Sequence, residues 1–152
     1  MFEKLKDKLS FERHVKGPVN YVKVSREDYT KTAAYLKENS FNRLLTVGAV
    51  DWLEKRTFEV YFLVHNMIEN IYVKVATEIP RENPQIPTLS SFWPNAAMHE
   101  RESWELFGIK FTGNSMLKPL FLEDWNGPPP FRKDFNWRDY VKKTFKLPQA
   151  EG

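Results

Sequence analysis

The first half of the chain alternates between helical and strand-like patterns of apolar residues. Phe2, Leu5 and Leu9 recur at helical spacing among charged residues, which predicts a short amphipathic helix that ends at Gly17-Pro18. A second helix is predicted after a Ser-Arg-Glu-Asp segment that resembles a capping box, and it ends at about Glu38. The residues expected on its buried face are Tyr29, Ala33 and Leu36.

Four segments have the composition of β-strands. Residues 19–24 and 41–50 are rich in apolar and β-branched side chains. Residues 58–64 are almost continuously apolar, which predicts a central strand covered on both faces. Residues 71–76 alternate between apolar and other side chains, which predicts a half-buried strand. The chain is therefore expected to be α+β, with a mixed sheet of about four or five strands and helices packed on it.

The second half of the chain has a different character. It holds nine of the ten prolines and four of the five tryptophans. Trp93-Pro94 opens a predicted helix that runs to Phe107, and Gly108 suits its C-terminal cap. After this helix, prolines and glycines exclude long regular elements, yet aromatic residues remain frequent. We therefore expect an α+β domain over residues 1–112 and an extended, aromatic and proline-rich tail over residues 113–152 that docks on a partner.

Composition excludes several classes of chemistry. The chain has no cysteine, so it forms no disulfide, no thiolate-ligated zinc site, no iron–sulfur cluster of its own and no cysteine nucleophile. No apolar run approaches the ~20 residues that span a bilayer, and the charged start shows no signal peptide, which predicts a cytoplasmic protein. Residues 128–146 carry six basic and two acidic residues, which suggests an acidic partner surface, lipid headgroups or a solvated tail.

The helix expected after Trp93 carries the candidate chemistry. His99-Glu100 resembles the start of a zinc-protease motif, but position 103 is serine, and the three histidines have no metal-ligand spacing. Glu100 lies in the middle of an aromatic stripe on this helix. A buried carboxylate needs a partner, so we expect an arginine or lysine from the tail or from another subunit to pair with it.

Residues 93–135 closely resemble a known family, the 30 kDa subunit of respiratory complex I, which is the NADH-quinone oxidoreductase. The resemblance includes an Arg-Lys-Asp-Phe sequence at residues 132–135. The other matching residues are Glu100, Arg101, Glu102, Trp104, Glu105, Phe107, Gly108, Ile109 and Gly113.

The sequence also departs from the family's pattern. The family usually has Gly-His-Pro where this chain has Gly113-Asn114-Ser115, and often has Gly-His-Pro-Leu where this chain has residues 127–131. The Lys-Pro-Leu sequence at residues 118–120 is more similar to the relatives of this subunit in membrane-bound, energy-converting hydrogenases.

The resemblance implies a non-catalytic structural subunit in the peripheral arm of a membrane-bound, ion-pumping redox complex, on the cytoplasmic side of the cell membrane. Such a subunit packs on a large catalytic subunit similar to the NiFe-hydrogenase large subunit (the 49 kDa subunit), beside iron–sulfur subunits. It carries no cofactor; iron–sulfur clusters, and in the hydrogenase branch a NiFe centre, belong to the partners. The predicted interface comprises Glu100, Arg101, Glu102, Trp104, Phe107, Trp125, Arg132, Lys133, Asp134 and Phe135.

Two other functions remain open from the residues alone. The basic tail, with Phe131, Phe135 and Trp137 interleaved, is also compatible with binding of single-stranded nucleic acid. The family resemblance, in contrast, implies that the protein has no nucleic-acid partner. A hydrolase that uses Glu100 or Glu102 with His99 is the third candidate.

Overall fold

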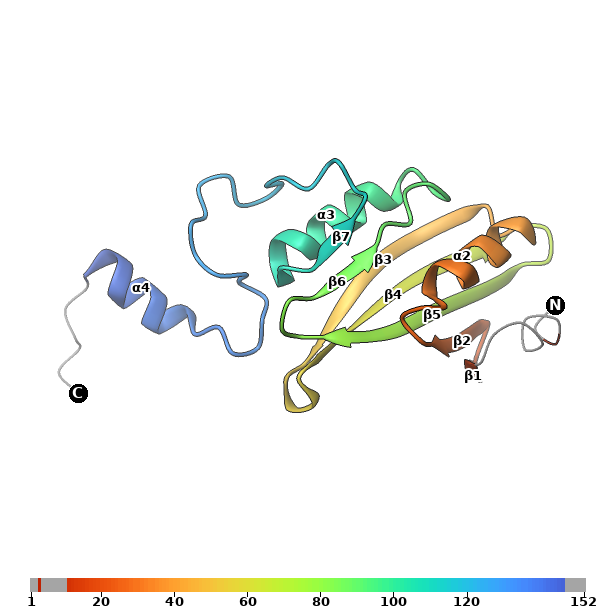
Figure 1. Ribbon diagram of the computed structural model, residues 1–152, viewed down its shortest axis with the longest axis horizontal. Helices are drawn as coiled ribbons and strands as arrows, with labels where there is room; N and C mark the ends of the chain where they lie inside the picture. Colours follow the sequence, from red (N-terminus) through yellow and green to blue (C-terminus); the bar gives the residue numbers. More distant parts are fainter. Residues whose placement is uncertain (1–2, 4–10, 147–152) are drawn as a thin grey trace.

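A five-stranded mixed sheet forms the body of the protein (Figure 1). The computed structural model describes residues 11–146 and Glu3. The strand order is β1-β2-β5-β4-β3, in which β2 and β5 are parallel and the other neighbours are antiparallel. The expected α+β class and strand number are therefore confirmed. The strands are β1 (Phe11–Lys16), β2 (Val19–Val24), β3 (Arg43–Trp52), β4 (Thr57–Asn66) and β5 (Ile71–Pro80).

Two helices share a single hydrophobic core with one face of the sheet. Helix α2 (Tyr29–Glu38) packs on β5 and helix α3 (Ala96–Phe107) packs on β3. The ring of Phe62 from β4 contacts α2 and the segment just before α3, with its centroid 5.3 Å from that of Tyr29 and 5.7 Å from that of Trp93. The predicted buried face of α2 is confirmed, since Tyr29, Ala33 and Leu36 are all fully buried.

The prediction that residues 58–64 form a strand inside the sheet is confirmed, but the prediction that both faces of this strand are covered is wrong. Phe58, Val60, Phe62 and Val64 are fully buried, but the residues between them on β4 are only partly buried. The run of apolar residues suggests two covered faces because it includes Tyr61, but the ring of Tyr61 lies on the face of the sheet that no helix of the described residues covers. It lies across the strand from Gly48, whose missing side chain leaves room for its ring.

Strand β1 was not predicted, because the charged residues between Phe11 and Gly17 have no clear alternation. It pairs with β2 across a tight turn at Gly17, whose φ of +60° suits glycine. Most of the helix predicted from Phe2, Leu5 and Leu9 lies outside the described residues, but its predicted end at Gly17 is wrong, because residues 11–16 form β1. A short helix, η1 (Leu53–Lys55), joins β3 to β4.

The chain after β5 forms a smaller layer beside the sheet. Two short strands, β6 (Gln85–Pro87) and β7 (Lys110–Thr112), pair in parallel before and after α3. Residues 113–136 then run over α3 without regular structure, and α4 (Trp137–Phe145) stands apart from the sheet (Figure 1). The division into a domain over residues 1–112 and a partner-docking tail stays a prediction.

Gly108 ends α3 as the sequence predicts. Its φ is +77°, and its N–H donates to the carbonyl of Trp104 at 2.8 Å. A Cβ at this position would lie 2.9 Å from Cγ of Pro129, so the tail also crosses the helix end at this glycine. Both the backbone conformation and the close approach therefore need glycine here.

We expect Gly108→Ala to lower the free energy of unfolding by about 2 kcal/mol, measured by chemical denaturation. About 1 kcal/mol comes from the left-handed conformation, and the rest from the collision with Pro129. In a Pro129→Ala background the same substitution should cost only about 1 kcal/mol, because the colliding Cγ is gone. An equal loss in both backgrounds would show that the tail does not rest on the helix end.

Candidate partner interface

Glu100 is the most buried charged residue of α3, and its carboxylate faces three donors of its own chain. Oε1 accepts the N–H of Leu89 at 2.7 Å. Oε2 accepts the hydroxyl of Thr88 at 2.6 Å and the side-chain amide of Asn114 at 2.9 Å. All three donors are neutral, so the prediction that an arginine or lysine pairs with Glu100 is wrong. The donors come from the turn before α3 and the turn after β7, and with these hydrogen bonds the carboxylate needs no basic partner.

Burial raises the pKa of the Glu100 carboxyl above its ordinary value of 4.5, and the hydrogen bonds from Leu89, Thr88 and Asn114 offset this only in part. The nearby hydroxyl of Tyr29 is buried and has no hydrogen-bond partner among the described residues; burial, reinforced by the charge of Glu100, raises its pKa. Because Glu100 is fully buried and all three contacts are internal, no substrate can reach it in this conformation. The geometry therefore argues against a hydrolase built on Glu100.

The next turn of α3 holds the tail. The Glu105 carboxylate accepts the backbone N–H groups of Leu120, Phe121 and Leu122 at 2.8–3.2 Å. One helical turn earlier, Arg101 donates to the carbonyls of Lys118, at 2.6 Å, and Pro119. A cation and an anion at positions i and i+4 thus bind the carbonyls and the amides of one tail segment. Neither interaction was predicted, since both use the tail backbone, which has no sequence signature.

A second anchor joins the tail to the sheet. Asp51, at the end of β3, receives a bidentate hydrogen bond from Arg81 at 2.9 and 3.0 Å, and also the N–H of Lys133 at 2.8 Å. Arg81 bridges onward to Asp134 at 2.6 Å. Burial alone would raise the pKa of Asp51, but the hydrogen bonds from Arg81 and Lys133 outweigh it and hold the pKa below its ordinary value. The side chains of Asp51 and Arg81 are 1% and 12% exposed.

Between these two anchors the tail packs through aromatic rings and one arginine. Arg132 donates to the carbonyl of Phe107 at 2.8 Å and lies 5.2 Å from the centroid of Phe58. Further along, four rings form an aromatic cluster with centroid separations of 4.8–5.8 Å. The members of this cluster are Trp125, Phe135, Trp137 and Tyr140.

The structure brings nine of the ten predicted interface residues to the surface of α3 and the tail. Glu102, Lys133 and Asp134 are exposed. Partly buried are Arg101, Trp104, Phe107, Trp125, Arg132 and Phe135. Glu100 is the exception, because its side chain is fully buried and has no surface to offer a partner. The interface role of the other nine residues stays a prediction.

The tail also exposes large apolar side chains that it does not bury itself. Four aromatic residues between positions 113 and 146 are 48–67% exposed. They are Phe121, Phe131, Trp137 and Phe145. Monomeric proteins seldom leave so many aromatic side chains in water on one segment. The sequence predicts an aromatic tail but does not predict which of its side chains are exposed.

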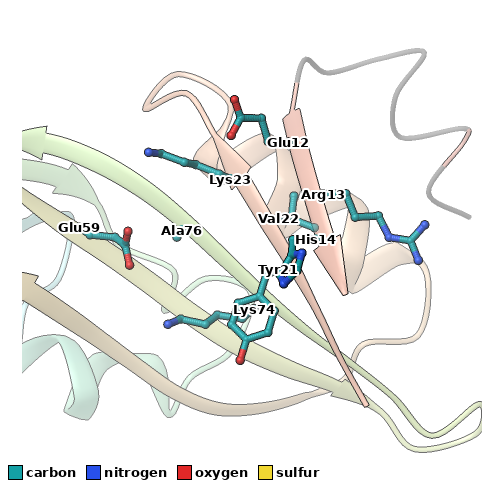
Figure 2. A pocket seen from close by; sticks show the side chains of 9 residues that line it. All are labelled: Glu12, Arg13, His14, Tyr21, Val22, Lys23, Glu59, Lys74 and Ala76. Carbon is teal, nitrogen blue, oxygen red and sulfur yellow. The ribbon is translucent and has the colours of Figure 1, made fainter. Parts of the chain in front are cut away.

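The open face of the sheet carries a pocket of about 300 Å³ between β1, β2, β4 and β5 (Figure 2). Two of its charged side chains have contacts within the chain. Lys23 forms an ion pair with Glu78 at 2.7 Å, and the ammonium of Lys74 lies 4.0 Å from the ring centroid of Tyr61. None of the predicted site residues lines this pocket.

Residues 11–146 and Glu3 contain neither a group of side chains placed to hold a metal ion nor a membrane-spanning helix. In this part of the chain no group of three or more histidine, aspartate or glutamate side chains is placed to hold a metal ion. No helix in the same part is long and apolar enough to cross a membrane.

We expect the difference in unfolding free energy between the wild-type protein and Glu100→Gln to depend on pH. A carboxyl whose pKa is raised by folding contributes its full stability below the unfolded pKa, near 4.5, and loses it as the pH rises through the folded pKa. The wild type should therefore lose stability relative to the variant as the pH rises above about 4.5. Denaturation of both proteins at several pH values measures this difference. If the stability of the wild type relative to the variant stays constant or increases with pH, the burial of an ionisable carboxyl is contradicted.

Asp51→Asn should lower the free energy of unfolding by about 3 kcal/mol, because it leaves the buried Arg81 guanidinium poorly paired. The matched control is Asp134→Asn, which removes the other partner of Arg81 at a carboxylate that is 52% exposed. It should cost less than about 1 kcal/mol. Limited proteolysis should also cleave residues 113–146 faster in Asp51→Asn than in the control. Equal effects of the two variants would show that the buried pair is not the main anchor.

Comparison with known proteins agrees with this architecture. The model of the family described as "Respiratory-chain NADH dehydrogenase, 30 Kd subunit" matches residues 22–141. One subunit of the NADH-quinone oxidoreductase of Erythrobacter litoralis is 32% identical over 71% of this chain, and the chain spans 43% of the length of that relative. One subunit of the F(420)H(2) dehydrogenase of Methanosarcina mazei is 32% identical over 74% of this chain and 72% of its own length.

A solved structure extends the similarity to nearly the whole chain. One chain of the membrane-bound sulfane sulfur reductase (MBS), an archaeal respiratory membrane complex, superposes with a TM-score of 0.85 and 27% identity. The match covers 99% of this chain and 92% of that one. Because the family model covers more than half of the residues, including β3 to β7 and most of the tail, the chain belongs to the family of the 30 kDa subunit of respiratory-chain NADH dehydrogenase.

Proposed function

We propose that the protein is a non-catalytic structural subunit in the peripheral, cytoplasmic arm of a membrane-bound redox complex. It packs on a large subunit similar to that of NiFe hydrogenases, beside iron–sulfur subunits that carry the redox centres. The observation that carries the proposal is the tail, which is fixed on α3 and the sheet while its aromatic side chains remain in water. The family of the chain and the respiratory complex in which its structural relative occurs support the same assignment.

The anchors explain how such a tail can bind tightly. A flexible segment loses conformational entropy when it docks, which weakens binding. Here Glu105 and Arg101 hold residues 118–122, and Asp51 holds Lys133, before any partner arrives. The exposed aromatic rings are then presented on a backbone that is already ordered. Aromatic side chains of this kind contribute a large share of the energy at protein interfaces.

The proposed interface carries an acidic residue, Glu102, at one place and basic residues around Arg138 at another. Glu102 lies on the outward side of α3, whereas Arg138, Lys142 and Lys143 lie on α4. The partner surface is therefore expected to be acidic near α4 and less acidic near α3. Charge complementarity of this kind sets orientation and specificity more than it sets affinity.

Affinity purification of the tagged chain from gently solubilised membranes tests the proposal. A hydrogenase-like large subunit and iron–sulfur subunits should co-purify with the wild-type chain. Phe121→Ser and Phe145→Ser together should reduce their recovery by at least about tenfold, because each exposed ring is expected to supply ~1 kcal/mol or more of binding energy.

The matched control replaces Met67 and Ile68 with serine. These residues are also exposed and apolar, at 68% and 86%, but they lie at the β4–β5 turn, outside the proposed interface. Recovery should remain at the wild-type level in this control. If the wild-type chain is recovered without larger subunits, the proposed function is wrong.

A further inference from the structure

Strand β3 is an edge of the main sheet, and within the described residues no other strand pairs with its outer side. In an antiparallel pair, half of the backbone N–H and C=O groups of a strand point away from its partner. The side-chain amide of Asn95 donates to the carbonyl of Leu44 at 3.1 Å, at the start of this edge. Beyond that residue, no backbone hydrogen bond from another segment of residues 11–146 reaches the outer edge up to Val50.

The sequence of β3 does not protect this edge. Residues 44–50 read Leu-Leu-Thr-Val-Gly-Ala-Val and contain neither a charged residue nor a proline. Natural edge strands usually carry such residues, which prevent unwanted pairing. The opposite edge strand, β1, follows this rule, because four of its six residues are Glu12, Arg13, His14 and Lys16. The unprotected edge is therefore specific to β3.

A groove runs beside the same edge. Residues 46–49 of β3 form one wall, and Leu106 and Phe107 of α3 contribute to the other. Its volume is about 270 Å³, and Phe131 of the tail, which is 57% exposed, lines it as well. Glu102 lies at the groove, is exposed, and forms no ion pair with any described residue. The edge thus combines backbone groups, a groove with both polar and apolar lining, and one acidic side chain.

We propose that β3 accepts a sixth strand from an extended segment of a partner subunit. The backbone of that segment pairs with residues 45–50, one of its apolar side chains enters the groove beside Phe131, and a basic side chain pairs with Glu102. An extended polypeptide is the ligand that supplies alternating donors and acceptors together with side chains on one face. The inference rests on the proposed function, since it identifies one contact of that assembly.

A second copy of this chain is a poorer occupant of the edge. Two identical edges would pair about a twofold axis, so that residue i of one copy faces residue j of the other and residue j faces residue i. The edge of a second copy therefore offers residues 44–50 again, and this segment contains no basic side chain that could pair with Glu102. A different chain with a basic residue supplies that pairing.

Amide hydrogen exchange, read by mass spectrometry on the purified complex and on the purified chain, tests the inference. Exchange of the amides in residues 44–50 should be at least tenfold slower in the complex. Exchange in α2, which packs on β5 and not beside the β3 edge, should be the same in both samples. Protection of residues 44–50 in the chain alone, together with a dimer in solution, would overturn the inference in favour of a second copy.

A charge reversal provides the second measurement. Glu102→Lys should accelerate exchange of residues 44–50 in the complex by at least about threefold and reduce recovery of the partner. Glu27→Lys reverses an exposed charge before α2 and should change neither quantity. If the complex assembles normally but residues 44–50 are not protected in it, the added strand is disproved and the proposed function stands. If no complex assembles with the wild-type chain, the proposed function itself fails.

Discussion

The buried carboxylate of Glu100 fixes the position of α3, and the parts of the chain that face outward depend on that helix. An ionisable group at such a depth costs several kcal/mol unless hydrogen bonds compensate for its lost hydration. The donors come from Thr88 and Leu89, just after β6, and from Asn114, just after β7. The N–H of Thr88 also donates to the carbonyl of Thr112. One side chain therefore closes the end of the β6–β7 pair and holds it against the helix.

With Glu100 directed inward, helical geometry decides what its neighbours can contact. Each residue advances about 100° around an α-helix, so Arg101 and Glu105 lie on one side, within about 40° of each other, and Glu102 lies on the side opposite Glu100. The contacts follow this arrangement. Arg101 and Glu105 bind the tail backbone, and Glu102 faces the groove beside β3. The three charged neighbours thus have separate roles because the buried face of the helix, which includes Glu100, sets its rotation.

Sequence reasoning succeeded where local periodicity decides the structure. The stripe on α3 placed Glu100 in the core, and the glycine after Phe107 placed the end of that helix. It failed where distant backbone decides the outcome. The partners of Glu100 and Glu105 include main-chain N–H groups from other segments, and main-chain groups are the same for every residue type. It also failed for β1, whose many charged side chains tolerate exposure at a sheet edge, and for Tyr61, whose ring is placed by the absence of a side chain at Gly48.

The side chains that hold the chain together are largely different from those that it exposes. Asp51, Arg81 and Glu100 are buried or nearly so and are saturated by partners within the chain. Phe121 and Phe145 lie on the tail and Glu102 lies on α3, and the side chains of all three are exposed. A substitution at an anchor should therefore alter stability and assembly together, whereas a substitution at an exposed residue should alter assembly alone. This separation follows from the fold, because the tail backbone is bound through its amides and carbonyls, which leaves its aromatic side chains available to another protein.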